Sequence, residues 1–182
     1  MAHKISILNG AFGTMIEGVS RGHLLSSEFK QQAHELWVAH GGLIGLRGTD
    51  LAQITPNELM DWAACFGDVD YENFVAREDK QVEGLPILRI GNTRNKLGNK
   101  NSNFAKVPSL RNDFDIRYNP DTRRPVWHTD STFRQEPPIG SVFHCRQAPP
   151  SGGETLFSDT RSSLKKLDHE QRENLEGLEA IC

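Results

Sequence analysis

A histidine and an aspartate stand two residues apart in the last third of this 182-residue chain, as His128 and Asp130. Successive side chains of a β-strand alternate between its faces, so an extended segment over 126–130 would project both groups to the same side. A neutral imidazole and a carboxylate are two of the three ligands of the facial site that holds non-haem Fe(II), with three positions left open for chemistry. The spacing therefore predicts a metal site here.

The tripeptide is weak evidence by itself, because the chain contains seven histidines and eleven aspartates. The competing interpretation is a histidine at a strand end beside a solvated aspartate. The neighbouring sequence favours the metal site. Trp127 and Phe133 flank the pair, a Pro-Pro pair follows at 137–138, and Gly-Gly at 152–153 precedes a second strand-like run, Glu-Thr-Leu-Phe.

The ordered set over 124–160 is Trp-His-Thr-Asp-x-Thr-Phe, Pro-Pro, then Pro-x-Gly-Gly-Glu-Thr-x-Phe-x-Asp. It resembles the taurine dioxygenase / 2,4-D dioxygenase (TauD/TfdA) family of Fe(II)- and 2-oxoglutarate-dependent oxygenases, closely here and loosely over most of the chain. The resemblance implies a mainly β fold with flanking helices, a cupin-like double-stranded β-helix (jelly-roll) with iron at one mouth. We expect a single domain over 1–182 that is incomplete at its C-terminus.

The resemblance also implies roles for individual residues. By position, His128 and Asp130 match the first two iron ligands, and Thr155 matches the threonine that hydrogen-bonds the distal carboxylate of 2-oxoglutarate. A hydroxyl donor suits a carboxylate acceptor. Two family residues have no counterpart: a late third histidine ligand, and an arginine about ten residues after it that binds 2-oxoglutarate. His144 and His169 are the later histidines, and neither occupies the family position.

The candidates for the substrate wall are Trp127, Phe133, Asn92 and a polar tract over 93–124. A long stretch without secondary structure inside a compact domain is often a lid or binding loop, so we expect an active-site loop at 93–124. The alternative for this tract is a solvated loop, and the alternative for the two aromatic residues is the core of the barrel.

The expected activity is hydroxylation of a small organic substrate, expected to be anionic, with O2 consumed and 2-oxoglutarate converted to succinate and CO2. Because the chain resembles the N-terminal half or two thirds of a full-length enzyme, the alternative function is a truncated, non-catalytic fragment that acts as a metal-binding or interaction module. A cupin-type metal protein of another chemistry is a third option, against which the Gly-Gly-Glu-Thr run argues.

Composition excludes several other classes of protein. The formal net charge of −3 gives no electrostatic footprint for nucleic acid. No apolar run approaches the ~20 residues needed to span a membrane, and the first residues lack a signal-peptide pattern. The three cysteines are scattered, so we expect no disulfide framework and a reducing cytoplasm. A homo-oligomer is among the expected assemblies.

Local patterns predict the elements that would position these groups. Over 1–25 we expect an edge strand followed by a loop. Helices are predicted where a capping residue precedes an apolar stripe: over 27–40, after the capping box Thr-Pro-Asn-Glu at 55–58, and after Asp168 with Gln171 at the box position. A further helix is predicted from Thr160, where Leu164 and Leu167 have helical spacing. Strands are predicted over 42–48, 85–92, 141–146 and 154–158.

Overall fold

The computed structural model of the chain describes residues 3–8, 12–71, 81–90, 127–132, 134–148, 150 and 155–179. These residues form two compact units. The first unit combines Met1–Gly67 with Ile139–Cys182, and the second unit is Asp68–Pro138. Both contain β-structure, and the first also contains helices. The expectation of a single domain over 1–182 stays a prediction.

A three-stranded mixed sheet forms the centre of the first unit. Its strands β1 (Lys4–Ile7), β2 (Thr14–Glu17) and β3 (Ile44–Arg47) lie in the order β1-β2-β3. β1 pairs antiparallel with β2, and β2 pairs parallel with β3. The predicted strands at the N-terminus and at 42–48 are therefore confirmed, whereas β2 was not predicted because its four residues lie among glycines.

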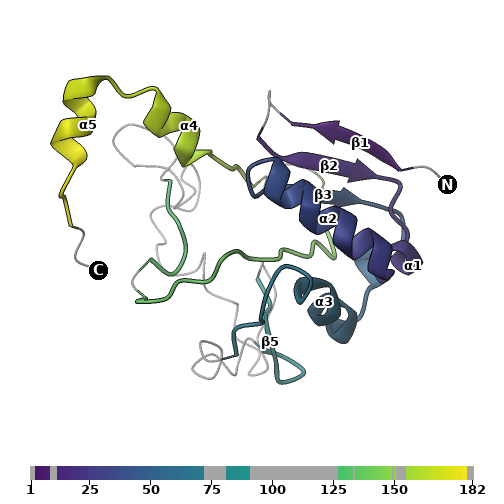
Figure 1. Cartoon of the computed structure of the whole chain (residues 1–182). Helices are drawn as coiled ribbons and strands as arrows, with labels where there is room; N and C mark the ends of the chain where they lie inside the picture. The colour runs from purple at the N-terminus through teal and green to yellow at the C-terminus, as the bar shows by residue number, and fades with distance from the viewer. Residues whose placement is uncertain are drawn as a thin grey trace. The chain divides into compact units, whose positions relative to one another are not determined.

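The register of the sheet separates an apolar face from a charged one. The apolar face carries Ile5, Ile7, Thr14, Ile16, Ile44 and Leu46. Helix α2 (Ser27–Ala39) runs along this face (Figure 1) and buries Phe29 and Ala33. On the other face Glu17 binds both Lys4 and Arg47, at 3.3 and 3.2 Å. This division explains why α2 packs on one side only.

The helices begin where the capping residues predict. Ser26 caps α2, and α3 (Pro56–Ala63) begins with the full capping box of Thr55 and Glu58. Asp168 and Gln171 form a second capping box at α5 (His169–Leu175). The remaining short helices are α1 (Arg21–Leu24), the 3-10 turn η2 (Leu51–Gln53) and α4 (Thr160–Lys165), which Asp159 caps. No helix in the described part of the chain is long and apolar enough to cross a membrane.

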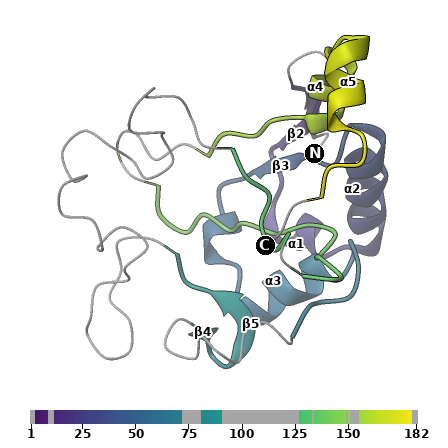
Figure 2. The same ribbon diagram turned by 90° about the vertical axis from the view of Figure 1, so that its left-hand side faces the viewer.

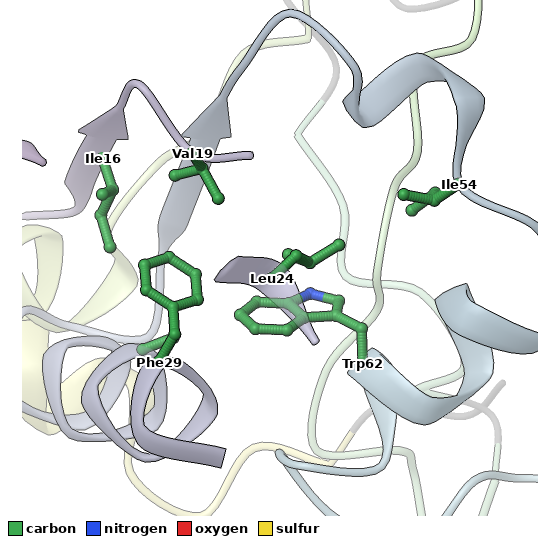
Figure 3. Packing of buried hydrophobic residues seen from close by; sticks show 7 residues of the cluster. Ile16, Val19, Leu24, Phe29, Ile54 and Trp62 are labelled. Carbon is green, nitrogen blue, oxygen red and sulfur yellow. The ribbon is translucent and has the colours of Figure 1, made fainter. Parts of the chain in front are cut away.

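The hydrophobic core of the first unit lies between the sheet, α2 and α3. Its buried members are Ile16, Val19, Leu24, Phe29, Ala33, Ile54 and Trp62. Figure 3 shows the Phe29 ring facing the Trp62 indole, with Leu24 beside the indole. The two ring centroids are 5.9 Å apart and the rings are stacked. The prediction that the tryptophan of α3 belongs to the core is confirmed.

Thr14 is a polar residue that the core encloses. Thr14 is fully buried on β2, and its hydroxyl has no hydrogen-bond partner among the described residues. Leaving such a group unsatisfied costs about 1–3 kcal/mol. We therefore expect Thr14→Val to raise the free energy of unfolding by about 1 kcal/mol, measured by urea denaturation. Thr14→Ser, which keeps the hydroxyl and loses the methyl, should lower it by about 1 kcal/mol; a loss of stability in Thr14→Val would mean that the hydroxyl has a partner.

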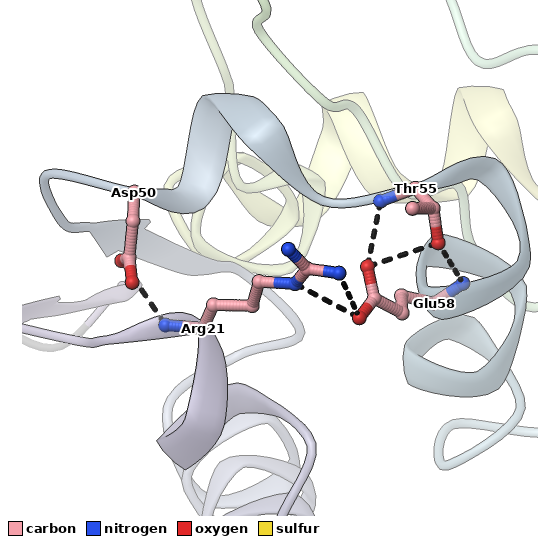
Figure 4. Close-up of polar contacts among 4 residues, drawn as sticks. All are labelled: Arg21, Asp50, Thr55 and Glu58. Carbon is pink, nitrogen blue, oxygen red and sulfur yellow. Dashed lines mark hydrogen bonds and ion pairs between the residues drawn. The ribbon is translucent and has the colours of Figure 1, made fainter.

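A polar cluster joins α1, η2 and α3 on the surface of the first unit (Figure 4). The Glu58 carboxylate accepts hydrogen bonds from the Thr55 backbone N–H at 2.7 Å and from two Arg21 guanidinium nitrogens at 2.9 and 2.7 Å. Asp50 accepts from the Arg21 backbone N–H at 3.0 Å. These donors, the Thr55 N–H first and Arg21 second, lower the pKa of Glu58 from 4.5 to about 2.

The depressed pKa of Glu58 makes stability depend on pH. Since the unfolded chain protonates this carboxyl near pH 4.5, its stabilising effect is present above that pH and is lost as pH falls towards 2. We expect Glu58→Gln to have a flatter profile of melting temperature against pH than the wild type between about pH 5 and 2. Glu35→Gln removes an exposed carboxylate that accepts a bond from Gln31, and its profile should follow the wild type. Identical profiles for Glu58→Gln and wild type would contradict this assignment.

The described β-structure of the second unit is a hairpin. Strands β4 (Gln81–Val82) and β5 (Leu85–Leu88) pair antiparallel, and Figure 2 shows them as a two-stranded ribbon. The connecting residues Glu83 and Gly84 both have positive φ, 54° and 75°, as a two-residue type I′ turn requires. The strand predicted over 85–92 is thus confirmed over its first half.

Two predicted strands do not form. Residues 141–145 and 155–158 have no regular secondary structure, which corrects the strand predictions for 141–146 and 154–158. Their large apolar side chains are exposed: Val142, Phe143, Leu156 and Phe157. Alternation in a sequence predicts which side chains would share a face, but a strand also needs a neighbour that completes its hydrogen bonds. Neither segment has such a neighbour in the described part of the chain.

Candidate metal centre

The His-x-Asp tripeptide lies in the second unit, where the backbone turns. Residues 127–129 have no regular secondary structure and a turn begins at Asp130, so the extended strand expected over 126–130 is not formed. Ser131 follows with φ of +61°, in the left-handed region that non-glycine residues rarely adopt. The two side chains nevertheless lie close together, with His128 Nε2 and Asp130 Oδ1 at 3.2 Å.

This separation fits two ligands of one metal ion. Metal–ligand bonds of about 2.1 Å place two neighbouring ligands of an octahedron about 3.0 Å apart. Both side chains are largely exposed, 69% for His128 and 66% for Asp130, so their open side can accept further ligands. The donor set, one imidazole nitrogen and one carboxylate oxygen, matches two thirds of the 2-His-1-carboxylate set. The residues present therefore fit Fe(II) chemically as a partial site.

A second imidazole–carboxylate pair shows that the distance alone is not diagnostic. His169 Nδ1 and Glu173 Oε2 are also 3.2 Å apart, one turn from each other on α5. Both of these side chains are exposed as well. What distinguishes His128 and Asp130 is the motif around them. No group of three or more His, Cys, Asp or Glu side chains that could hold a metal occurs in the described ranges.

His144 has a structural role. Its Nε2 lies 2.7 Å from the carbonyl oxygen of Leu51 in η2, and the side chain is half-buried. Because a carbonyl only accepts, this nitrogen carries the proton and donates. The contact attaches the irregular segment after Pro138 to the helical part of the first unit.

The other predicted site residues are only partly described. Trp127 is 54% exposed beside His128. Thr155 is exposed in an irregular segment of the first unit, whereas His128 and Asp130 belong to the second unit. Phe133, Asn92 and the loop predicted at 93–124 lie outside the described residues. The structure thus brings together the two predicted iron ligands.

Sequence patterns did not point to one contact near the pair. Arg134 Nη1 lies 2.6 Å from Asp70 Oδ2, and the two residues are 64 positions apart. Both side chains are mostly buried, at 21% and 28% exposure. No local periodicity or capping rule connects residues at such a separation, so only the tertiary structure could identify this ion pair.

Taken with its motif, the imidazole–carboxylate pair is typical of metal-dependent oxygenases. The chain belongs to the taurine catabolism dioxygenase TauD, TfdA family, whose profile matches residues 6–182. The resemblance inferred from residues 124–160 is thereby confirmed.

Similar proteins are named as dioxygenases that depend on alpha-ketoglutarate, the same compound as 2-oxoglutarate. The dioxygenase cnsP of Penicillium expansum is 38% identical over 99% of this chain and 44% of its own length. A sulfonate dioxygenase of Saccharomyces cerevisiae is 24% identical over 98% of this chain and 38% of its own length. A 2,4-dichlorophenoxyacetate dioxygenase of Cupriavidus pinatubonensis is 40% identical over 30% of this chain and 19% of its own length. The chain thus spans about two fifths of the length of the first two relatives; no solved structure matches it.

Proposed function

We propose that the protein is an Fe(II)- and 2-oxoglutarate-dependent dioxygenase that hydroxylates a small organic anion. Family membership and the names of the relatives support dependence on 2-oxoglutarate. The observation that carries the metal assignment is the convergence of His128 and Asp130 at 3.2 Å inside the motif. Bound Fe(II) would supply the means to activate O2. In the balanced reaction, one oxygen atom enters succinate, the other enters the new hydroxyl group, and CO2 is released.

The side chains of this chain have distinct roles in the proposal. His128 and Asp130 hold the metal by adjacent donor atoms, and their exposed side leaves room for 2-oxoglutarate and substrate. The Thr155 hydroxyl donates a hydrogen bond to the distal carboxylate of 2-oxoglutarate. The negative charge of the acceptor strengthens this hydrogen bond. Trp127 forms part of the substrate wall, with Phe133, Asn92 and the 93–124 loop as further candidates.

The relatives support an anionic substrate. One is named for sulfonates and another for 2,4-dichlorophenoxyacetate, and both classes of compound carry an anionic group. We extend this feature to the present protein without choosing between a sulfonate and a carboxylate. The jelly-roll fold of the family, a cytoplasmic location and a possible homo-oligomer belong to the same proposal. The alternative, a non-catalytic metal-binding or interaction module, is not favoured by relatives that are named as enzymes.

The direct test is an activity assay of the full chain with Fe(II), ascorbate and 2-oxoglutarate, in which product formed is compared with O2 consumed. Candidate sulfonates and aryloxyacetates are supplied in parallel, and succinate and dissolved O2 are measured. We expect succinate to form in proportion to O2 consumed, only with Fe(II), and faster with an accepted substrate. Thr155→Val removes one hydrogen bond to an anion, worth about 1.5–3 kcal/mol, and should raise the KM for 2-oxoglutarate about 10- to 100-fold. Succinate formation that does not depend on Fe(II) would overturn the proposal.

A further inference from the structure

The ion pair between Asp70 and Arg134 lies in the same compact unit as the predicted iron ligands. Its 2.6 Å contact is largely shielded from water, with side-chain exposures of 28% and 21%. Attraction between such charges is screened less than between exposed ones. By contrast, His128 and Asp130 are about two thirds exposed and gain little orientation from packing. The orientation of the two ligands must therefore be set through the backbone that joins them to a fixed point.

A short turn connects the ion pair to the ligands. The Arg134 backbone N–H donates to the Ser131 carbonyl oxygen at 3.1 Å, closing a turn that begins directly after Asp130. Ser131 holds φ at +61°, a conformation that a free chain rarely samples and that surrounding contacts must maintain. The turn therefore ends at Arg134, whose side chain is held by Asp70. Asp130 lies directly before the start of the turn.

We propose that Arg134 is a positioning residue for the metal pair, and that Asp70 is its anchor. The Asp70–Arg134 ion pair fixes the far end of the 131–134 turn, and the turn then holds the Asp130 carboxylate beside the His128 imidazole. When the two ligands are already held together, less of the free energy of metal binding is spent on ordering the chain. This inference rests on the proposed function, since it concerns the same two ligands.

A merely structural role for the ion pair makes a different prediction. If Asp70 and Arg134 only stabilise the fold, breaking the pair lowers the melting temperature but leaves the metal affinity of the folded protein unchanged. If they position the ligands, folded protein with a broken pair binds metal more weakly. Outer partners that orient metal ligands typically contribute about 10- to 100-fold in affinity. Metal affinity, measured below the melting temperature, separates the two roles.

The experiment titrates the tag-free full chain with Co(II) in the presence of 2-oxoglutarate and follows the visible d–d absorption of the bound ion. The variants are Arg134→Gln, Asp70→Asn, Arg134→Lys and the charge-exchanged pair Asp70→Arg with Arg134→Asp. Lys30→Gln is the matched control, because it breaks an ion pair of 2.7 Å between Lys30 and Asp61 in the first unit. Circular dichroism confirms that each variant is folded at the titration temperature.

We expect Arg134→Gln and Asp70→Asn to bind Co(II) about 10- to 100-fold more weakly than the wild type, Arg134→Lys to lose less, and Lys30→Gln to lose nothing. Should Arg134→Gln not fold, Asp70→Asn decides: weaker Co(II) binding by the folded variant supports positioning, and the charge-exchanged protein should then recover affinity. Wild-type affinity in folded Arg134→Gln or Asp70→Asn, with His128→Ala weakened, overturns positioning alone. Equal affinity in wild type and His128→Ala overturns the metal site and the positioning role together.

Discussion

His128→Ala should abolish 2-oxoglutarate turnover while leaving the protein folded. The imidazole is one of the two predicted ligand groups, which lie 3.2 Å apart, and its 69% exposure means that it contributes little to packing. Losing a ligand removes several kcal/mol of stabilisation that the metal gives to the transition state. Succinate formation should therefore fall about a thousandfold or more, to the background rate of Fe(II) without protein. The measurement is the initial rate of succinate formation, with melting temperature recorded in parallel.

His169→Ala is the matched control for this change. His169 faces Glu173 at the same 3.2 Å separation and is also exposed, so the variant removes an equivalent group outside the motif. We expect it to retain wild-type turnover, and Asp130→Asn to behave like His128→Ala. The assignment of the metal site would be contradicted if turnover survived in His128→Ala. It would also be contradicted if His169→Ala lost turnover to the same extent.

Trp62→Ala should be severely destabilising. Trp62 is 5% exposed; its indole stacks on Phe29 with centroids 5.9 Å apart and forms a T-shaped contact with Phe66, with centroids 5.4 Å apart. Truncating a buried tryptophan costs about 3–5 kcal/mol through lost burial and the remaining cavity. Small domains are stable by only about 5–15 kcal/mol, so urea denaturation should show a large shift of the midpoint or an unfolded protein.

Trp127→Ala is the control, because it deletes the same side chain from an exposed position. Trp127 is 54% exposed, so the free energy of unfolding should change by less than about 1 kcal/mol. Under the proposed function this variant should instead change the KM for the organic substrate. A stability loss in Trp127→Ala equal to that in Trp62→Ala would contradict the division between core and substrate wall.

Local sequence signals predicted the helices well. Ser26, the box of Thr55 and Glu58, and the box of Asp168 and Gln171 all cap helices that begin where expected. A capping residue satisfies backbone N–H groups only three positions away, so its effect needs no distant partner. Strand β2 and the hairpin strand β4 were missed, because such short strands carry too few residues for a period of two to be recognised.

The candidate site divides in the same way. Its motif, and through it the family, could be recognised from residue types and order alone. The backbone at the motif could not: residues 127–129 form no strand, and a turn begins at Asp130 with Ser131 at φ +61°. The two side chains lie 3.2 Å apart although residues 127–129 form no strand.

The sequence by itself determined the starts of α2, α3 and α5, the core tryptophan and the family, because each depends on residues that are near one another in the chain. The tertiary structure alone decided the order of the sheet, the lack of a ladder at 141–145 and 155–158, the attachment of His144 to Leu51, and the Asp70–Arg134 ion pair. These features join residues up to 93 positions apart. Whether such residues meet depends on the packing of the whole unit, which no local pattern records.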